Sequence, residues 1–153
     1  MPHHRVARLI LAAAVAASSA WPAVHAAQTP KGQFRARLSV VPLDLAMQGR
    51  IAGRGSVTAT LNGPTLTVKG EFAALKTPAT VARLHNGVKG IRGPAVFDLT
   101  LTPGTSGKIN ATLDLTPAQV EDLARERFYV QLHSEKAPDG NLWGWLLAQE
   151  TKR

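Results

Sequence analysis

Residues 128–148 read Phe-Tyr-Val-Gln-Leu-His-Ser-Glu-Lys-Ala-Pro-Asp-Gly-Asn-Leu-Trp-Gly-Trp-Leu-Leu-Ala. Apolar and polar residues alternate from Phe128 to His133, and a returning strand is predicted from Leu142 to Ala148. Because successive side chains of an extended strand point to opposite faces, each half predicts a strand with one aliphatic face. Pro138-Asp139-Gly140 closes an intervening loop, predicted over residues 134–140. The segment therefore predicts an antiparallel β-hairpin.

The other face of this hairpin is polar and aromatic. The expected cross-strand pairs are His133 with Asn141, Gln131 with Trp143, and Tyr129 with Trp145. Two tryptophans opposite the aliphatic face make an amphipathic patch, and such patches on a monomer usually mark binding surfaces. The alternative is that the tryptophans pack under the helix, the N-terminal segment or the stretch 43–54.

A second histidine ends the segment Ala82-Arg83-Leu84-His85-Asn86-Gly87. Alternation places Arg83 and His85 on one face, and Gly87, Gly90 and Gly93 follow at three-residue intervals. Glycines in such a turn provide positive φ angles or close backbone approach. The spacing does not match a phosphate loop, because a predicted strand rather than a helix follows.

Elsewhere, short alternating stretches recur about every ten residues between Gly, Pro and Asn turns, which is typical of small antiparallel β domains. We expect an all-β fold, an antiparallel Greek-key-like β-sandwich of about eight strands with one short surface helix. Thr116-Pro117-Ala118-Gln119 forms a capping box that starts the helix, and Val120, Leu123 and Ala124 line its apolar face. The expected strands are 33–39, 55–61, 66–72, 80–85, 94–101, 108–115, 127–133 and 142–148.

The N-terminus predicts an export signal. Arg5 and Arg8 precede an apolar run of about a dozen residues, too short for a membrane span, and Val24-His25-Ala26 is a small-residue cleavage site. We expect a signal peptide over 1–26, cleaved after Ala26, a flexible segment over 27–32, a single domain over 33–149 and a tail over 150–153. The mature protein is then periplasmic or secreted, with no transmembrane span.

The amino-acid composition excludes several kinds of site and favours one kind of partner. Cysteine is absent, which excludes disulfides, thiolate metal sites and thiol catalysis. The chain has 18 basic and 10 acidic residues, and loss of Arg5 and Arg8 with the signal leaves a basic domain of about +6. Such a charge favours an anionic partner. Nucleic acid is not expected, because the cations are scattered and no base-reading motif accompanies them.

The stretch from Gly55 to Leu147 resembles a CHRD domain, the module named after chordin and found in exported bacterial proteins. The first motif is Ala82 to Gly87 with Gly90, Gly93, Pro94 and Val96; the second is Phe128 to His133 with Pro138, Gly140, Leu142, Gly144 and Leu146. The resemblance implies a β-sandwich. This sequence departs from the family pattern at Arg83, where a first histidine often stands, and at Asn141 and Trp143.

Two functions compete on these residues. In the first, an exported, non-enzymatic binding module engages a protein or glycan, possibly an anionic one, through a polar-aromatic strand face. Its candidate contact residues are Arg83, His85, Tyr129, Gln131, His133, Asn141, Trp143 and Trp145.

The alternative is a periplasmic copper- or zinc-binding protein that uses His85 and His133, with Glu135 or Asp139 completing the ligand set. Catalysis is not expected, because Ser134 and His133 are strand neighbours that point to opposite faces and no pair of carboxylates is apparent. No catalytic residue and no cofactor other than such a metal is therefore predicted. Nothing in the sequence indicates an oligomeric state.

Overall fold

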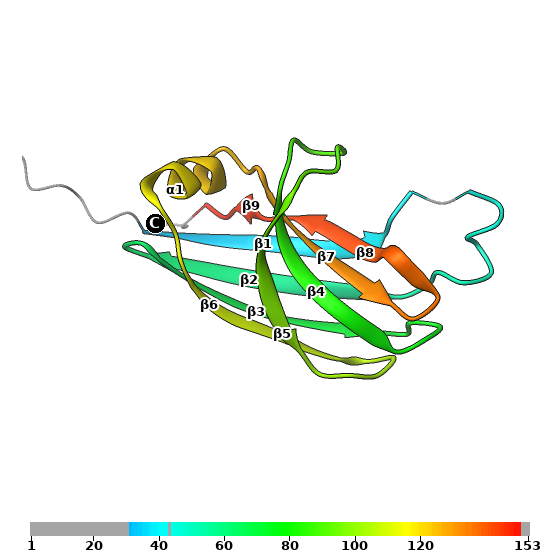
Figure 1. Ribbon diagram of the computed structural model, residues 1–153. Coiled ribbons are helices and arrows are strands. Elements are labelled where there is room, and N and C mark those ends of the chain that lie inside the picture. Colours follow the sequence, from blue (N-terminus) through cyan, green and yellow to red (C-terminus); the bar gives the residue numbers. More distant parts are fainter. Residues whose placement is uncertain (1–30, 43, 151–153) are drawn as a thin grey trace, which may run out of the picture.

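The computed structural model describes residues 31–42 and 44–150; the predicted signal peptide, residues 27–30 and the last three residues lie outside this part. Within it the chain forms nine strands and one helix (Figure 1). In chain order they are β1 (Lys31–Val40), β2 (Arg54–Asn62), β3 (Thr65–Ala73), β4 (Ala79–Asn86), β5 (Ala95–Leu101), β6 (Gly107–Asp114), α1 (Pro117–Ala124), β7 (Phe128–Ser134), β8 (Ala137–Trp145) and β9 (Leu147–Ala148).

Eight of these strands form a closed antiparallel barrel. Their order is β2-β3-β6-β5-β4-β7-β8-β1, and β1 closes the ring by pairing with β2; the two-residue β9 adds to β1. The prediction of an all-β chain with one short helix is confirmed. In place of the expected sandwich of two sheets the strands close into one barrel, which removes the free sheet edges that a sandwich would leave.

Closure depends on two strands that change partners along their length. β1 pairs with β2 from Lys31 to Leu38 and with β8 at Ser39 and Val40. β5 pairs with β4 over its first five residues and with β6 at Thr100 and Leu101. Two halves, one of β1, β2, β3 and β6 and one of β4, β5, β7 and β8, are thereby joined. β4, β5, β6 and β7 have the spatial order of a Greek key, because β7 returns beside β4.

One core fills the barrel, and each strand contributes alternate residues to it. In β2 the buried residues are Val57, Ala59 and Leu61, and in β7 the apolar residues from Phe128 to Leu132 are fully buried. α1 lies at one end of the barrel, between β6 and β7 (Figure 1). Both halves of its predicted capping box are present, and Leu123 is buried beneath it. Ala124, predicted on the same apolar face, is exposed.

The hairpin of β7 and β8 is tighter than predicted. β8 begins at Ala137, and Ser134 pairs with Ala137 across a two-residue turn, so the loop expected over 134–140 is wrong. The residues from Pro138 to Asn141 instead form a bulge opposite His133, because the register shifts between Leu132 and Ser134. Pro138 and Gly140 predicted a loop here, but in the structure they lie within the bulge of β8, where both residue types are commonly found.

β1 begins two residues earlier than predicted, because Lys31 and Gly32 pair with Asn62 and Leu61. Residues 44–53 form a turn-rich loop between β1 and β2. In the part of the chain that the structure describes, no helix has the length and apolar character needed to span a bilayer.

Candidate functional site

Four aromatic rings form a continuous cluster on the outer face of β4, β7 and β8. Tyr129 stands at its centre: its ring is 4.9 Å from the His85 ring in a stacked arrangement, and 4.6 Å from the Trp145 ring. The Trp143 ring contacts the Tyr129 and Trp145 rings, with its centroid 6.0 Å from that of Tyr129 and 4.8 Å from that of Trp145. These separations lie in the range where aromatic pairs attract. The register behind the cluster, with Tyr129 opposite Trp145 and Gln131 opposite Trp143, confirms two of the three predicted pairs.

The turn after β4 wraps over this cluster and is held by its polar atoms. The Tyr129 hydroxyl accepts a hydrogen bond from Gly93 N at 3.0 Å and donates to Gly93 O at 3.3 Å. His85 Nδ1 lies 2.9 Å from the same carbonyl, and Trp145 Nε1 donates to Gly87 O at 3.0 Å. The rings of His85, Tyr129 and Trp145 therefore each have an apolar body in the cluster and a polar edge on the turn.

The glycines of this turn perform the two roles that the sequence indicated. Gly90 has φ +83°, a left-handed conformation that favours glycine. Gly87 and Gly93 are required by close approach: a Cβ on Gly93 would lie 1.7 Å from Asn86 O. The turn can pack on the aromatic rings only because these positions have no side chain.

His133 lies at the bulge of β8. Its Nδ1 is 2.7 Å from Pro138 O, and the side chain of neighbouring Gln131 donates to Asp139 O at 3.0 Å. A carbonyl can only accept, so the proton of neutral His133 sits on Nδ1 and the Nε2 lone pair is free. Burial lowers the pKa of His133, against an opposing effect of the Pro138 carbonyl; the charges of Arg83, His85 and Arg92 lower it further.

Three residues predicted as contact residues are instead buried. Tyr129 is fully buried among its neighbouring rings, and Gln131 is 3% exposed. Asn141 is also fully buried and donates to Ser134 Oγ at 2.8 Å, so the predicted pairing of Asn141 with His133 is wrong. The physical reason is the bulge, which turns Asn141 away from the outer face.

The candidate contact residues that remain at the surface are partly exposed. They are Arg83, His85, His133, Trp143 and Trp145.

Arg83 forms an ion pair with Asp98 of the neighbouring strand β5. Its Nε lies 2.8 Å from Asp98 Oδ1, across the β4–β5 pair. The register places Arg83 and Gln131 opposite each other, between the positions of His85 and His133. His85 and His133 are thus four residues apart along the ladder, about 13 Å at 3.3 Å per residue. Among the described residues no group of three or more His, Cys, Asp or Glu side chains gathers, so the metal alternative gains no support.

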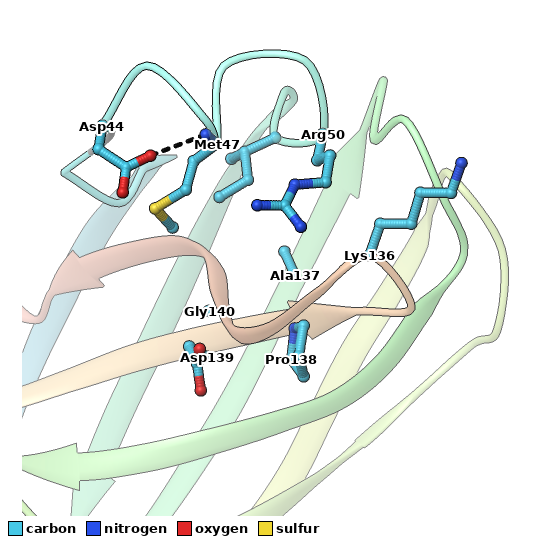
Figure 2. Close-up of a pocket in the computed structure, with 9 residues that line it drawn as sticks. Asp44, Met47, Arg50, Lys136, Ala137, Pro138, Asp139 and Gly140 are labelled. Atoms are coloured by element: carbon cyan, nitrogen blue, oxygen red, sulfur yellow. Dashed lines mark hydrogen bonds between the residues drawn. The ribbon is translucent and has the colours of Figure 1, made fainter.

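A loop that the sequence did not place in the site borders it. Trp143 packs against a small cluster of Val41, Ile51 and Ala137, joined by Met47 of the turn-rich loop. This loop and the β7–β8 turn enclose a pocket of about 270 Å³ (Figure 2). In Figure 2 Arg50 extends from the loop toward the hairpin. Val41, Met47 and Ile51 support Trp143 from the side.

Sequence reasoning missed two further supports of the site. Arg92 Nη1 donates to Asp139 O at 2.6 Å, which ties the glycine turn to the β8 bulge. Lys89 Nζ lies 2.5 Å from Glu126 Oε2 and ties the same turn to the segment after α1. The bond of Arg92 is to a backbone carbonyl 47 residues away, and the carboxylate that pairs with Lys89 is 37 residues away, so only the fold brings these partners together.

The fold and site define a small all-β barrel domain with an outward-facing aromatic cluster, anchored between a glycine turn and a bulged hairpin. A family profile described as the CHRD domain matches residues 34–146, and the chain belongs to this family. No curated protein and no solved structure matched the chain.

Proposed function

We propose that this chain is an exported, non-enzymatic binding module, and that Trp143 and Trp145 are the centre of its contact surface. The observation that carries the proposal is the exposure of these two side chains. Both point away from the barrel core and are only half-buried. Large aromatic side chains dominate interface energies because they bury much area and lose little rotamer freedom.

The cluster is also rigid before any partner binds. Tyr129 below the tryptophans is fully buried, and the Trp145 indole is fixed by its hydrogen bond to Gly87 O. A preorganised surface loses less conformational entropy on binding. Membership of the CHRD family agrees with a binding role.

The glycine turn enlarges the surface with aliphatic side chains. Val88 and Ile91 are 54% and 62% exposed, on a turn whose ends are bonded to Tyr129 and Trp145. Aliphatic groups beside aromatic ones are the composition of an interface core, whereas Arg83 and His133 would belong to its polar rim.

The geometry of the indoles favours a protein partner over a glycan. The two ring planes meet at 67° in an edge-to-face arrangement. They therefore do not present two parallel faces on which a row of sugar rings could stack. A second copy of the chain is one form that this partner can take.

The test measures how well the mature domain and matched variants of it retain a partner. The immobilised domain is exposed to the exported proteins of its source, captured protein is identified and purified, and its Kd is measured by calorimetry. Trp143→Ala should weaken binding about 30-fold, the effect of a 2 kcal/mol hot spot. Val88→Ser with Ile91→Ser should weaken it without a loss of folding, since both side chains are exposed.

Two controls keep this test decisive. Thr60→Ala with Thr67→Ala, on the exterior of the other barrel half, should leave the Kd unchanged. Circular dichroism melting checks that each variant is folded. Equal Kd values for the parent and both aromatic-face variants would overturn the proposal, and saturable binding of the same face to a glycan array instead would overturn the protein assignment.

A further inference from the structure

The tryptophans lie on β8, and the barrel half formed by β1, β2, β3 and β6 does not contain them. The cations that point outward from this half lie on one surface. The exterior of β1, β2, β3 and β6 shows six cations against two acids. The cations are Lys31, Arg35, Arg37, Arg54, Lys69 and Lys108, and the acids are Glu71 and Asp114. We call this surface the basic face.

Within residues 31–42 and 44–150, the ion pairs lie elsewhere. All four that form join side chains of β4, β5, α1, the glycine turn after β4 and the segment after α1. Asp114, at the far end of the basic face, accepts a hydrogen bond from Thr65. Glu71 and Asp114 offset only part of the charge of the six cations, so the face keeps an excess of positive charge. Such an excess attracts polyanions.

The basic face is hollowed where its side chains are short. Arg37, Ser56, Glu71 and Lys108 form one row across the four strands. Beyond this row stand Arg54, Ala73 and Ser106, while the residues between the rows point inward or are glycine. Small side chains ringed by long ones leave a depression of about 610 Å³, with three cations and one carboxylate among the residues that line it.

The depression continues along the strands. A second hollow shares Ser56, Glu71 and Lys108 with the first and extends to Thr58, Lys69 and Asn110. From the Arg54 row to the Thr58 row is four residues, about 13 Å at 3.3 Å per residue. Hydroxyl, amide and cationic groups line the trough together with the Glu71 carboxylate, Ala73 and glycines. Phe72 also borders it, but this side chain is only 3% exposed.

We infer that this trough binds an acidic polysaccharide, with the carboxylates of uronate sugars against Arg37, Arg54 and Lys108. Hydroxyl and amide groups in the trough match the hydroxyls of sugar rings, which a purely electrostatic site would not need. The trough has no aromatic platform of the kind that single-stranded nucleic acid requires. It also lacks the exposed apolar core expected of a protein interface. Arg37 stands at the border with the aromatic face, because Ser39, two residues further along β1, pairs with Trp143. The other residues that line the trough belong to β2, β3, β6 and the turn before β6, and the inference does not depend on the proposed function.

The test uses alginate, a polyuronate, as the probe and the mature domain as the binder. The domain should bind alginate with an affinity that falls as salt rises, and should not bind neutral dextran. Arg37→Gln, Arg54→Gln and Lys108→Gln combined should weaken binding about tenfold, equivalent to about 1.4 kcal/mol. The matched control is Arg50→Gln, Arg125→Gln and Lys136→Gln combined, which removes the same charge outside the basic face and should leave the affinity within about twofold.

Two further variants sharpen the result. Glu71→Gln removes the one carboxylate that lines the trough and should tighten alginate binding two- to threefold, a gain that damage to the fold cannot mimic. Trp143→Ala should leave alginate binding unchanged, which separates this site from the aromatic face. Equal losses in the two triple variants would overturn the inference. So would equally tight binding to a DNA oligonucleotide or to phosphatidylglycerol vesicles, because charge alone would then account for the binding.

Discussion

Replacement of Gly93 by alanine should be among the most damaging single changes in the glycine turn. The new Cβ would lie 1.7 Å from Asn86 O, although real Cβ contacts do not come closer than 3.0 Å. Because the obstacle is backbone, no side-chain rotation relieves the clash. The turn must move by roughly 1 Å or more, which takes its hydrogen bonds beyond bonding distance.

The cost follows from the bonds that this movement breaks. Three contacts are affected: Asn86 N to Pro94 O, the paired bonds between the Tyr129 hydroxyl and the Gly93 backbone, and the His85 contact with Gly93 O. At about 1 kcal/mol each, the free energy of unfolding falls by about 3 kcal/mol. For a domain of roughly 120 residues, with about 2.1 cal/mol/K of unfolding entropy per residue, Tm falls by about 12 °C.

Two other glycines provide the matched series. Gly90→Ala meets no atom within 4 Å but keeps φ +83°, so it should cost about 1 kcal/mol. Gly49→Ala meets neither obstacle and should be neutral or stabilising by a few tenths of a kcal/mol. Urea unfolding, followed by circular dichroism and by the fluorescence of Trp143 and Trp145, measures all three. A Gly93→Ala domain within 1 kcal/mol of Gly49→Ala would refute the reasoning.

Two further predictions concern pH and the helix cap. Because burial lowers the pKa of His133 in the folded state, the unfolded chain takes up the proton first. Stability should therefore be full above about pH 6.5 and fall as the pH drops below that value; His133→Gln should flatten the Tm–pH curve over this range, and an unchanged curve would contradict the assignment. Thr116→Ala removes the acceptor of the Gln119 N–H and should cost about 1 kcal/mol in urea unfolding, whereas Thr116→Ser should cost little; equal losses in both would show that the cap does not act through its hydroxyl.

Local patterns in the sequence were sufficient for the elements of the fold. Alternation located eight strand segments, and Thr116 with Gln119 located the helix start, because both depend on neighbours within a few residues. The pairs of Tyr129 with Trp145 and of Gln131 with Trp143 followed from the same alternation across one hairpin. Membership of the CHRD family was also legible in the two histidine segments.

The closure of the barrel and the exposure of the site side chains depended on contacts between residues far apart in the sequence. Whether the sheet closes is decided by β1, whose last two residues leave β2 and pair with β8. The bulge opposite His133 buries Asn141, a reversal that alternation cannot anticipate because one register shift exchanges the two faces. Tyr129 is buried because rings from the two neighbouring strands, β4 and β8, and the glycine turn enclose it.

The sequence by itself therefore determined what each segment is, because strand alternation and helix capping are local. Only the tertiary structure decided which polar and aromatic side chains reach solvent, because exposure depends on what distant segments place above them. Trp143 and Trp145 remain half-exposed, Tyr129 and Gln131 do not, and six cations from β1, β2, β3 and β6 meet on one face although they are scattered along the chain.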